Sequence, residues 1–162
     1  MKSTERLAIA APADAAMTVL ADPAFYLDRP TDEAIEFREL VTHDVSGDRV
    51  TLELRCAFTG ELNAAARALL DPGRLTWVQA SEHDLATGRV VFRIVPDHYA
   101  DRLRCRGRYV VTPDGSGASE RVVETELRVR APLVAGQVER ALVDGLRREL
   151  VAQCAAIPDY VD

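Results

Sequence analysis

The sequence predicts an α+β domain: a curved antiparallel sheet of about six to seven strands wrapped around a long C-terminal helix, with two short helices after the first strand. Three observations predict this fold. Most of the chain alternates apolar and polar residues with period two, short turns join the alternating segments, and the last segment carries an apolar stripe of helical period. The length of 162 residues fits one domain over residues 1–162.

The first predicted elements are a short strand over residues 4–10 and a helix that begins at Pro12. Proline suits a first helical turn, and Asp14 favours the positive end of the helix dipole. An Asp-Pro pair ends this helix, and a second short helix is predicted over residues 24–27.

Alternation then predicts the strands of the sheet, and Gly-containing or Pro-containing segments between them supply the turns. The predicted strands cover residues 33–45, 50–58, 75–83, 90–94, 103–111 and 123–129. Residues 61–70 predict a helix inside this series. Arginines alternate along 102–108 and glutamates along 124–126, which we interpret as a solvated charged outer face.

The last segment predicts one helix from Leu133 to Ile157, roughly 36 Å long at 1.5 Å per residue. Apolar residues recur every four positions from Val138 to Cys154. The opposite side mixes acidic and basic residues, as on a solvated helix rather than one lying on a membrane. The helix and the concave sheet would then enclose an apolar space.

Composition limits the classes of partner that the protein is expected to bind. The formal charge of −6, from 20 Lys+Arg and 26 Asp+Glu, disfavours nucleic acid. Neither a signal peptide nor an apolar run of membrane-spanning length is present, so we expect a cytoplasmic protein without stable membrane insertion. Three dispersed cysteines without C-x-x-C spacing indicate no disulfide and no metal site, and no cofactor is expected.

Catalytic motifs of nucleotide-binding proteins, serine hydrolases and zinc proteases are absent. His98 lies in a predicted loop, which we interpret as a surface loop. Ser81, His83 and Asp84 superficially resemble a catalytic triad. Residues two apart on a strand share one face rather than converge, however, so we expect polar groups at the surface or the rim.

Three polar residues, Glu39, His43 and Gln79, follow apolar residues in the inward phase of their strands. If they face inward, they could bind the polar end of a ligand, and Glu39 could act as a general base. Alternatively, strand twist or a bulge turns them outward, the interpretation we favour. The weak catalytic candidates are Glu39, His43 and Tyr109. The candidate ligand-binding residues are Phe37, Leu54, Cys56, Phe58, Trp77, Gln79, Phe92, Cys105, Gly107, Tyr109, Thr125, Leu142 and Leu146.

Two stretches and the sheet between them resemble the START-like (SRPBCC) superfamily, also called the helix-grip or polyketide cyclase group. The first stretch is the opening strand into Ala11-Pro12-Ala13-Asp14-Ala15-Ala16-Met17-Thr18-Val19-Leu20-Ala21-Asp22-Pro23. The second runs from Val129 to Glu139 and resembles the strand-to-helix junction of an uncharacterised bacterial family in this superfamily. Ala135 and Gln137 depart from the glycine and the lysine expected there.

The resemblance implies binding or transport of a hydrophobic or amphipathic molecule, lipid-like or polyketide-like, between sheet and helix. One alternative is a cyclase or dehydratase acting on a polyketide-like or aromatic substrate. Another is a protein-interaction module with a filled core. A non-enzymatic role is favoured, and the oligomeric state stays open. If Gly107 lines a cavity, Gly107→Leu should block ligand uptake without unfolding the protein.

Overall fold

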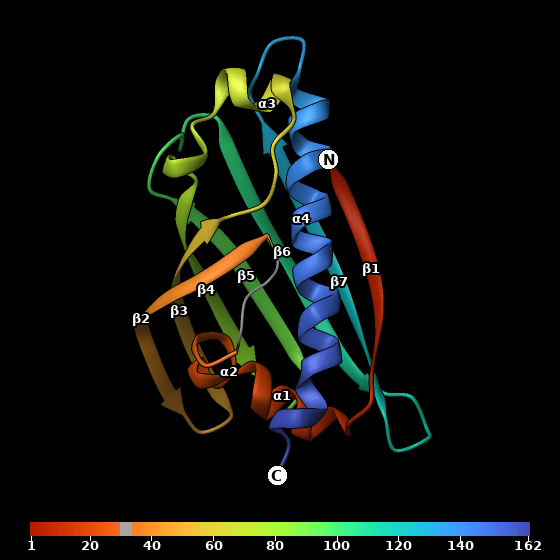
Figure 1. The fold of residues 1–162 in the computed structure, drawn as a ribbon. Helices are drawn as coiled ribbons and strands as arrows, with labels where there is room; N and C mark the ends of the chain where they lie inside the picture. Colours follow the sequence, from red (N-terminus) through yellow and green to blue (C-terminus); the bar gives the residue numbers. More distant parts are fainter. Residues whose placement is uncertain (30–33) are drawn as a thin grey trace.

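The computed structural model describes residues 1–29 and 34–162, and its centre is a seven-stranded antiparallel sheet curved around a long helix (Figure 1). The strand order is β1-β7-β6-β5-β4-β3-β2, so all neighbours except β1 and β7 are consecutive in the chain, and the connection from β3 to β4 carries α3 and η1. The strands are β1 (Lys2–Ile9), β2 (Ile35–Ser46), β3 (Arg49–Phe58), β4 (Thr76–Asp84), β5 (Arg89–Pro96), β6 (Leu103–Pro113) and β7 (Ser119–Val129). This is the predicted fold class. Residue 33, at the predicted start of the second strand, lies outside the described residues.

Two predicted helices begin later than their sequences suggest. The helices are α1 (Ala13–Leu20), α2 (Pro23–Leu27), α3 (Ala64–Leu69) and α4 (Ala135–Ala156), with short 3-10 turns η1 (Pro72–Arg74) and η2 (Ile157–Tyr160). α3 does not start at residue 61, because Asn63 caps it by accepting the backbone N–H of Ala66 at 2.8 Å. α4 does not include Leu133, whose φ of 70° is left-handed and cannot continue a helix.

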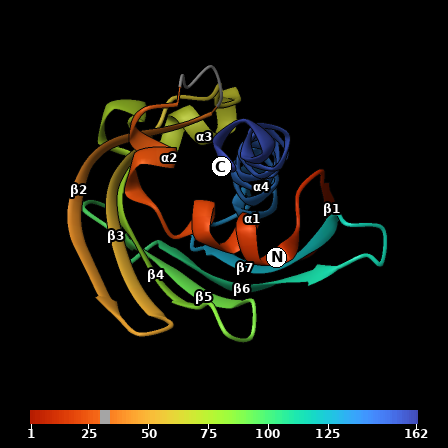
Figure 2. The same ribbon diagram turned by 90° about the horizontal axis from the view of Figure 1, so that it is seen from below.

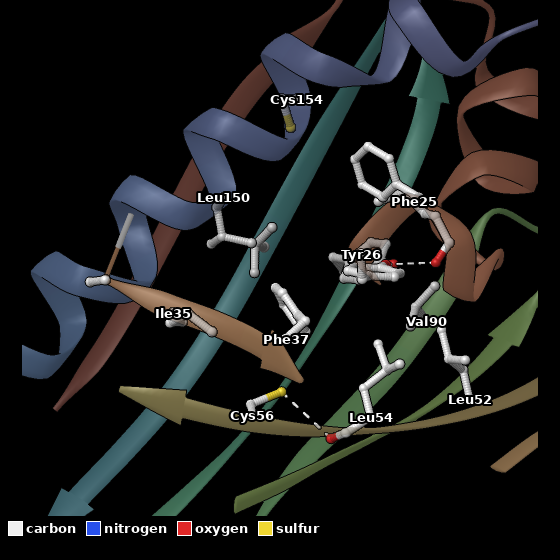
Figure 3. Packing of buried hydrophobic residues seen from close by; sticks show 14 of the residues in the cluster. Phe25, Tyr26, Ile35, Phe37, Leu52, Leu54, Cys56, Val90, Leu150 and Cys154 are labelled. Atoms are coloured by element: carbon white, nitrogen blue, oxygen red, sulfur yellow. Dashed lines mark hydrogen bonds between the residues drawn. The ribbon is translucent and has the colours of Figure 1, made fainter. Parts of the chain in front are cut away.

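The sheet bends around α4, and the first two helices cover one end of the space it encloses (Figure 2). Under the C-terminal half of α4 the core is filled by Leu150 of the helix, Phe25 and Tyr26 of α2, and Phe37 of β2 (Figure 3). The Tyr26 ring lies 5.0 Å from that of Phe37, and its hydroxyl donates to the Leu20 carbonyl at 2.6 Å. This end of the molecule is therefore closed by side chains.

A buried polar network ties the same end together. Arg29, which follows α2, forms an ion pair and hydrogen bond with Glu149 of α4. Gln153, one turn further along α4, donates to Glu149 at 3.0 Å and accepts from Arg121 of β7 at 2.9 Å. The Arg121 guanidinium also lies 4.0 Å from the centre of the Tyr109 ring. The network thus joins α4 to the α2 segment and to the sheet.

Ser81 and His83 of β4 are buried, which corrects the expectation that they lie at the surface or the rim. Both face the concave side, and Ser81 Oγ lies 2.9 Å from His83 Nε2. Residues two apart on a strand share one face, and their side chains are near enough for a hydroxyl to reach an imidazole. The two polar side chains can therefore be buried together because they bond to each other. His83 Nδ1 has no hydrogen-bond partner in the described part of the chain. Burial, with a smaller contribution from the charge of Arg121, lowers the pKa of His83 to about 4.

This burial predicts a loss of stability in mild acid. An unfolded histidine, with a pKa of about 6.5, binds a proton more readily than buried His83, so the free energy of unfolding falls as the pH drops from 6.5 toward 4. We expect a loss of about 2 kcal/mol between pH 7.5 and pH 5, measured by urea unfolding. His83→Asn should remove most of that loss, whereas His43→Asn, at an exposed position, should retain it. If both variants lost the same free energy of unfolding in acid, the acid sensitivity could not be assigned to His83.

Candidate functional site

An apolar cavity of about 80 Å³ lies between the middle of α4 and the sheet, and none of its lining residues belongs to α1 or α2. Strands β4, β5 and β6 form most of its wall, and three α4 residues form its roof. The lining residues are Ile35, Phe58, Leu75, Thr76, Trp77, Ile94, Pro96, His98, Leu103, Cys105, Leu127, Leu142, Val143 and Leu146. Only Thr76, His98 and the Trp77 indole nitrogen bring side-chain nitrogen or oxygen to this wall.

Phe58 forms one side of the cavity because two glycines let its ring approach the neighbouring backbone. A Cβ added to Gly145 of α4 would lie 2.7 Å from Cε2 of Phe58. A Cβ added to Gly60 would lie 2.7 Å from Cζ of the same ring. Neither distance is compatible with an ordinary contact, so the ring is wedged between the loop after β3 and the helix.

The Cys105 thiol in the wall stays neutral at neutral pH. Burial raises the pKa of Cys105 to about 12, so its thiol remains protonated. Trp77 is 9% exposed, and its indole N–H has no acceptor among the described residues. A buried donor without a partner costs on the order of 1 to 3 kcal/mol, which a ligand oxygen could recover. The cavity therefore suits an apolar group that carries at most one or two hydrogen-bond acceptors.

His98, in the loop between β5 and β6, is exposed and marks the mouth of the cavity. Its Nδ1 lies 3.3 Å from Nη2 of Arg74, and because a guanidinium can only donate, the imidazole nitrogen accepts. The next residue, Tyr99, has a left-handed φ of 62°. Two guanidinium groups lie near its ring, with centroid distances of 5.8 Å to Arg74 and 6.0 Å to Arg102.

Asp97 directly precedes His98, and its carboxylate already accepts hydrogen bonds from within the protein. Its carboxylate accepts from Thr76 Oγ1 at 2.7 Å and from Arg55 at 2.8 Å. The Thr76 hydrogen bond, with a further contribution from Arg55, lowers the pKa of Asp97 below its usual value. The carboxylate of Asp71 accepts the backbone N–H of Gly73 at 2.9 Å.

Five of the candidate ligand-binding residues meet at this cavity: Phe58, Trp77, Cys105, Leu142 and Leu146. The other eight do not line it. Phe37, Leu54, Cys56 and Tyr109 are packed in the closed core, and Thr125 is also buried. Burial raises the pKa of Tyr109, and its ring contacts Arg121 rather than the cavity.

The structure corrects the expectation that Gly107, in the middle of β6, lines a cavity beside Phe92. A Cβ on Gly107 would lie 2.4 Å from Cζ of Phe92 and 2.4 Å from the carbonyl oxygen of Glu124. The Phe92 ring therefore occupies the space above this glycine. Gly107→Leu would clash with backbone, so the predicted block of uptake without unfolding is not compatible with this geometry.

Two irregularities in β2 decide where the polar candidates face. The register with β3 shifts between Phe37 and Glu39 and again between Leu40 and Thr42. The first shift turns Glu39 outward, where it is exposed and accepts a hydrogen bond from Arg55 at 3.1 Å. The second restores the inward phase at His43, but that residue is exposed near the end of the hairpin. Gln79 is half-buried opposite Leu54 and does not line the cavity.

Sequence reasoning missed several lining residues, notably Ile35, Ile94, Leu103 and Leu127. Their inward phase was visible in the strand alternation, but the pattern does not tell an inward residue beside a void from one in a filled core. His98 gave no periodic signal, because it lies in a loop between strands.

Residues 1–29 and 34–162 contain neither a metal-binding cluster nor a membrane-spanning helix. No three His, Cys, Asp or Glu side chains are grouped so that they could hold a metal ion. No helix in those ranges is long and apolar enough to cross a membrane.

Solved structures with the same architecture confirm the START-like, helix-grip fold. The Zhui aromatase/cyclase from Streptomyces sp. R1128 superposes with a TM-score of 0.62 at 22% identity, covering 97% of this chain and 90% of that chain. Norcoclaurine synthase from Thalictrum flavum gives 0.62 at 18% identity, covering 97% and 85%. A START superfamily protein from Mycobacterium smegmatis gives 0.57 at 12%, covering 96% and 98%.

No curated protein matches the sequence. A family profile described as "Protein of unknown function (DUF2505)" matches residues 4–161, nearly the whole chain. The chain therefore belongs to this family, which the structure shows to have a helix-grip fold.

Proposed function

We propose that the protein binds a hydrophobic or amphipathic small molecule whose apolar part occupies the cavity between α4 and strands β4, β5 and β6. The observation that carries the proposal is a cavity beneath α4 whose lining is almost entirely apolar, with the exposed His98 at its edge. Apolar voids stay dry and favour apolar guests, because such guests regain contacts that the wall lacks. The structural likeness to a START superfamily protein, to an aromatase/cyclase and to norcoclaurine synthase supports this proposal.

The size of the cavity limits what it holds in this conformation. Pockets for small organic ligands measure about 300 to 1,000 Å³, well above the 80 Å³ found here. The closed form therefore accommodates a short chain or the edge of a ring, and a larger ligand needs the roof to move. Leu142, Val143 and Leu146, in the middle of α4, form the roof, and a shift of this part of the helix would enlarge the cavity. The first turns of α4 are tied to β7, because Glu139 accepts the backbone N–H of Val129 at 3.0 Å.

Binding is favoured over catalysis by Glu39, His43 or Tyr109, because these three candidate acid and base groups do not reach the cavity. Glu39 points to the outer face, His43 is exposed at the end of a hairpin, and Tyr109 is packed against Arg121. A general acid or base must come within hydrogen-bond distance of its substrate. These three residues would not meet a molecule bound behind His98.

Trp77 gives a direct test of ligand binding, since it is the chain's single tryptophan and lies in the cavity wall. We expect titration with 1-octanol to shift and quench tryptophan emission in a saturable way. Native mass spectrometry of the gently purified protein, followed by organic extraction, should release an apolar molecule bound at one per chain. No change in Trp77 emission with apolar probes and no extractable molecule would contradict the proposal.

Matched cysteine variants separate the void from the filled core. Cys105 lines the cavity, whereas Cys56 is fully buried outside it. Cys105→Leu should extend into empty space, change the free energy of unfolding by less than about 1 kcal/mol and weaken 1-octanol binding at least about 10-fold. Cys56→Leu should overpack the core and cost about 1 to 3 kcal/mol. Urea unfolding measures both values. Equal destabilisation with unchanged octanol binding in Cys105→Leu would show that the void is not the binding site.

A further inference from the structure

We infer that the ligand carries an anionic head, a carboxylate or a phosphate, held at the cavity mouth by Arg74 and Arg102 beside His98. The inference rests on the proposed function, because it assigns the other end of a molecule whose apolar part lies in the cavity. Its basis is the arrangement of η1 and the β5–β6 loop at the mouth.

Arg74 is placed beside the cavity by its neighbours in sequence and in space. The two residues that follow it, Leu75 and Thr76, line the cavity wall. Its guanidinium lies within hydrogen-bond distance of His98, which also lines the wall, at 3.3 Å. A ligand whose chain passes His98 would therefore bring its first polar atoms to this guanidinium.

The guanidinium groups of Arg74 and Arg102 both lie near the same aromatic ring, that of Tyr99. Both guanidinium groups lie about equally far from the centre of the Tyr99 ring, at 5.8 Å and 6.0 Å. The Tyr99 hydroxyl accepts the backbone N–H of Asp71 at 2.9 Å, so the ring is fixed to the segment that carries Arg74. Both cations therefore lie in the neighbourhood of one ring beside the cavity, where they would attract an anionic group.

Neither arginine has a carboxylate partner within the described part of the chain. Most other arginines around the sheet do: Arg55, Arg106, Arg108 and Arg128 all form ion pairs with acidic residues. Asp97 and Asp71, the acidic groups discussed above, are bonded to Arg55 and to the Gly73 backbone. The donors of Arg74 and Arg102 thus remain available to an anion from solution.

The backbone at Tyr99 supports a functional role for this loop. A φ of 62° in a residue with an aromatic side chain is rare and strained. Such strain persists where the surrounding structure holds it, and it concentrates at ligand sites. Here it places the ring of Tyr99 near both arginines while the preceding residue, His98, lines the cavity.

The test compares probes that share an eight-carbon chain and differ in the head: octanoate, octyl phosphate and 1-octanol, each titrated at pH 8 against Trp77 emission. We expect the anionic probes to bind about 3- to 10-fold more tightly than the alcohol, a modest preference because the arginines are exposed. Added salt should reduce this preference. A tighter complex with octyl phosphate would assign a phosphate head, and a tighter complex with octanoate a carboxylate.

Charge-removing variants at and away from the mouth provide the control. Arg74→Gln and Arg102→Gln should each reduce the preference for the anionic probes while leaving 1-octanol binding within about 2-fold. Arg93→Gln removes the same charge from the outer face of β5 and should change neither. If all three probes bind the parent protein equally tightly, the proposal of an anionic head is overturned, whereas the proposal that the cavity binds apolar chains stands. If no probe affects Trp77, both are overturned.

Discussion

The structure depends on the attachment of α4 to the concave side of the sheet through its buried C-terminal half. Glu149 and Gln153 connect this part of the helix to Arg29 after α2 and to Arg121 of β7. Removing one partner from a buried ion pair leaves an uncompensated charge and typically costs 3 to 5 kcal/mol. This half of α4 therefore cannot slide or tilt without breaking contacts that are expensive to lose.

The space beneath α4 differs along the helix as a consequence. At the end with α1 and α2, aromatic side chains such as Phe25, Tyr26 and Phe37 fill the space beneath the helix (Figure 3). Beneath the middle of α4, apolar side chains of the helix face the strands across a void of about 80 Å³. The buried network fixes the C-terminal half of the helix, and the α4 residues that face the void, Leu142, Val143 and Leu146, are apolar and can exchange their contacts for those of a guest.

The two parts of the proposed site differ in polarity: the void is apolar and its mouth is charged. The wall is apolar and its one buried thiol stays protonated, so it has little to offer a charge. Arg74 and Arg102 lie outside, where water still solvates them and where no described carboxylate neutralises them. An amphipathic molecule matches both parts without burying its charge, since only its apolar portion would leave water.

The sequence by itself determined the order of elements, the curved antiparallel sheet and the long helix, because alternation with period two and an apolar helical stripe are local properties of the chain. It also identified Phe58, Trp77, Cys105, Leu142 and Leu146 as inward residues, which they are. Only the tertiary structure decided which inward residues border a void. That depends on side-chain volumes meeting across the sheet and α4, as where Phe92 covers Gly107. It also decided that Glu39 faces outward, because a β-bulge reverses the facing of a strand without altering the alternation on either side.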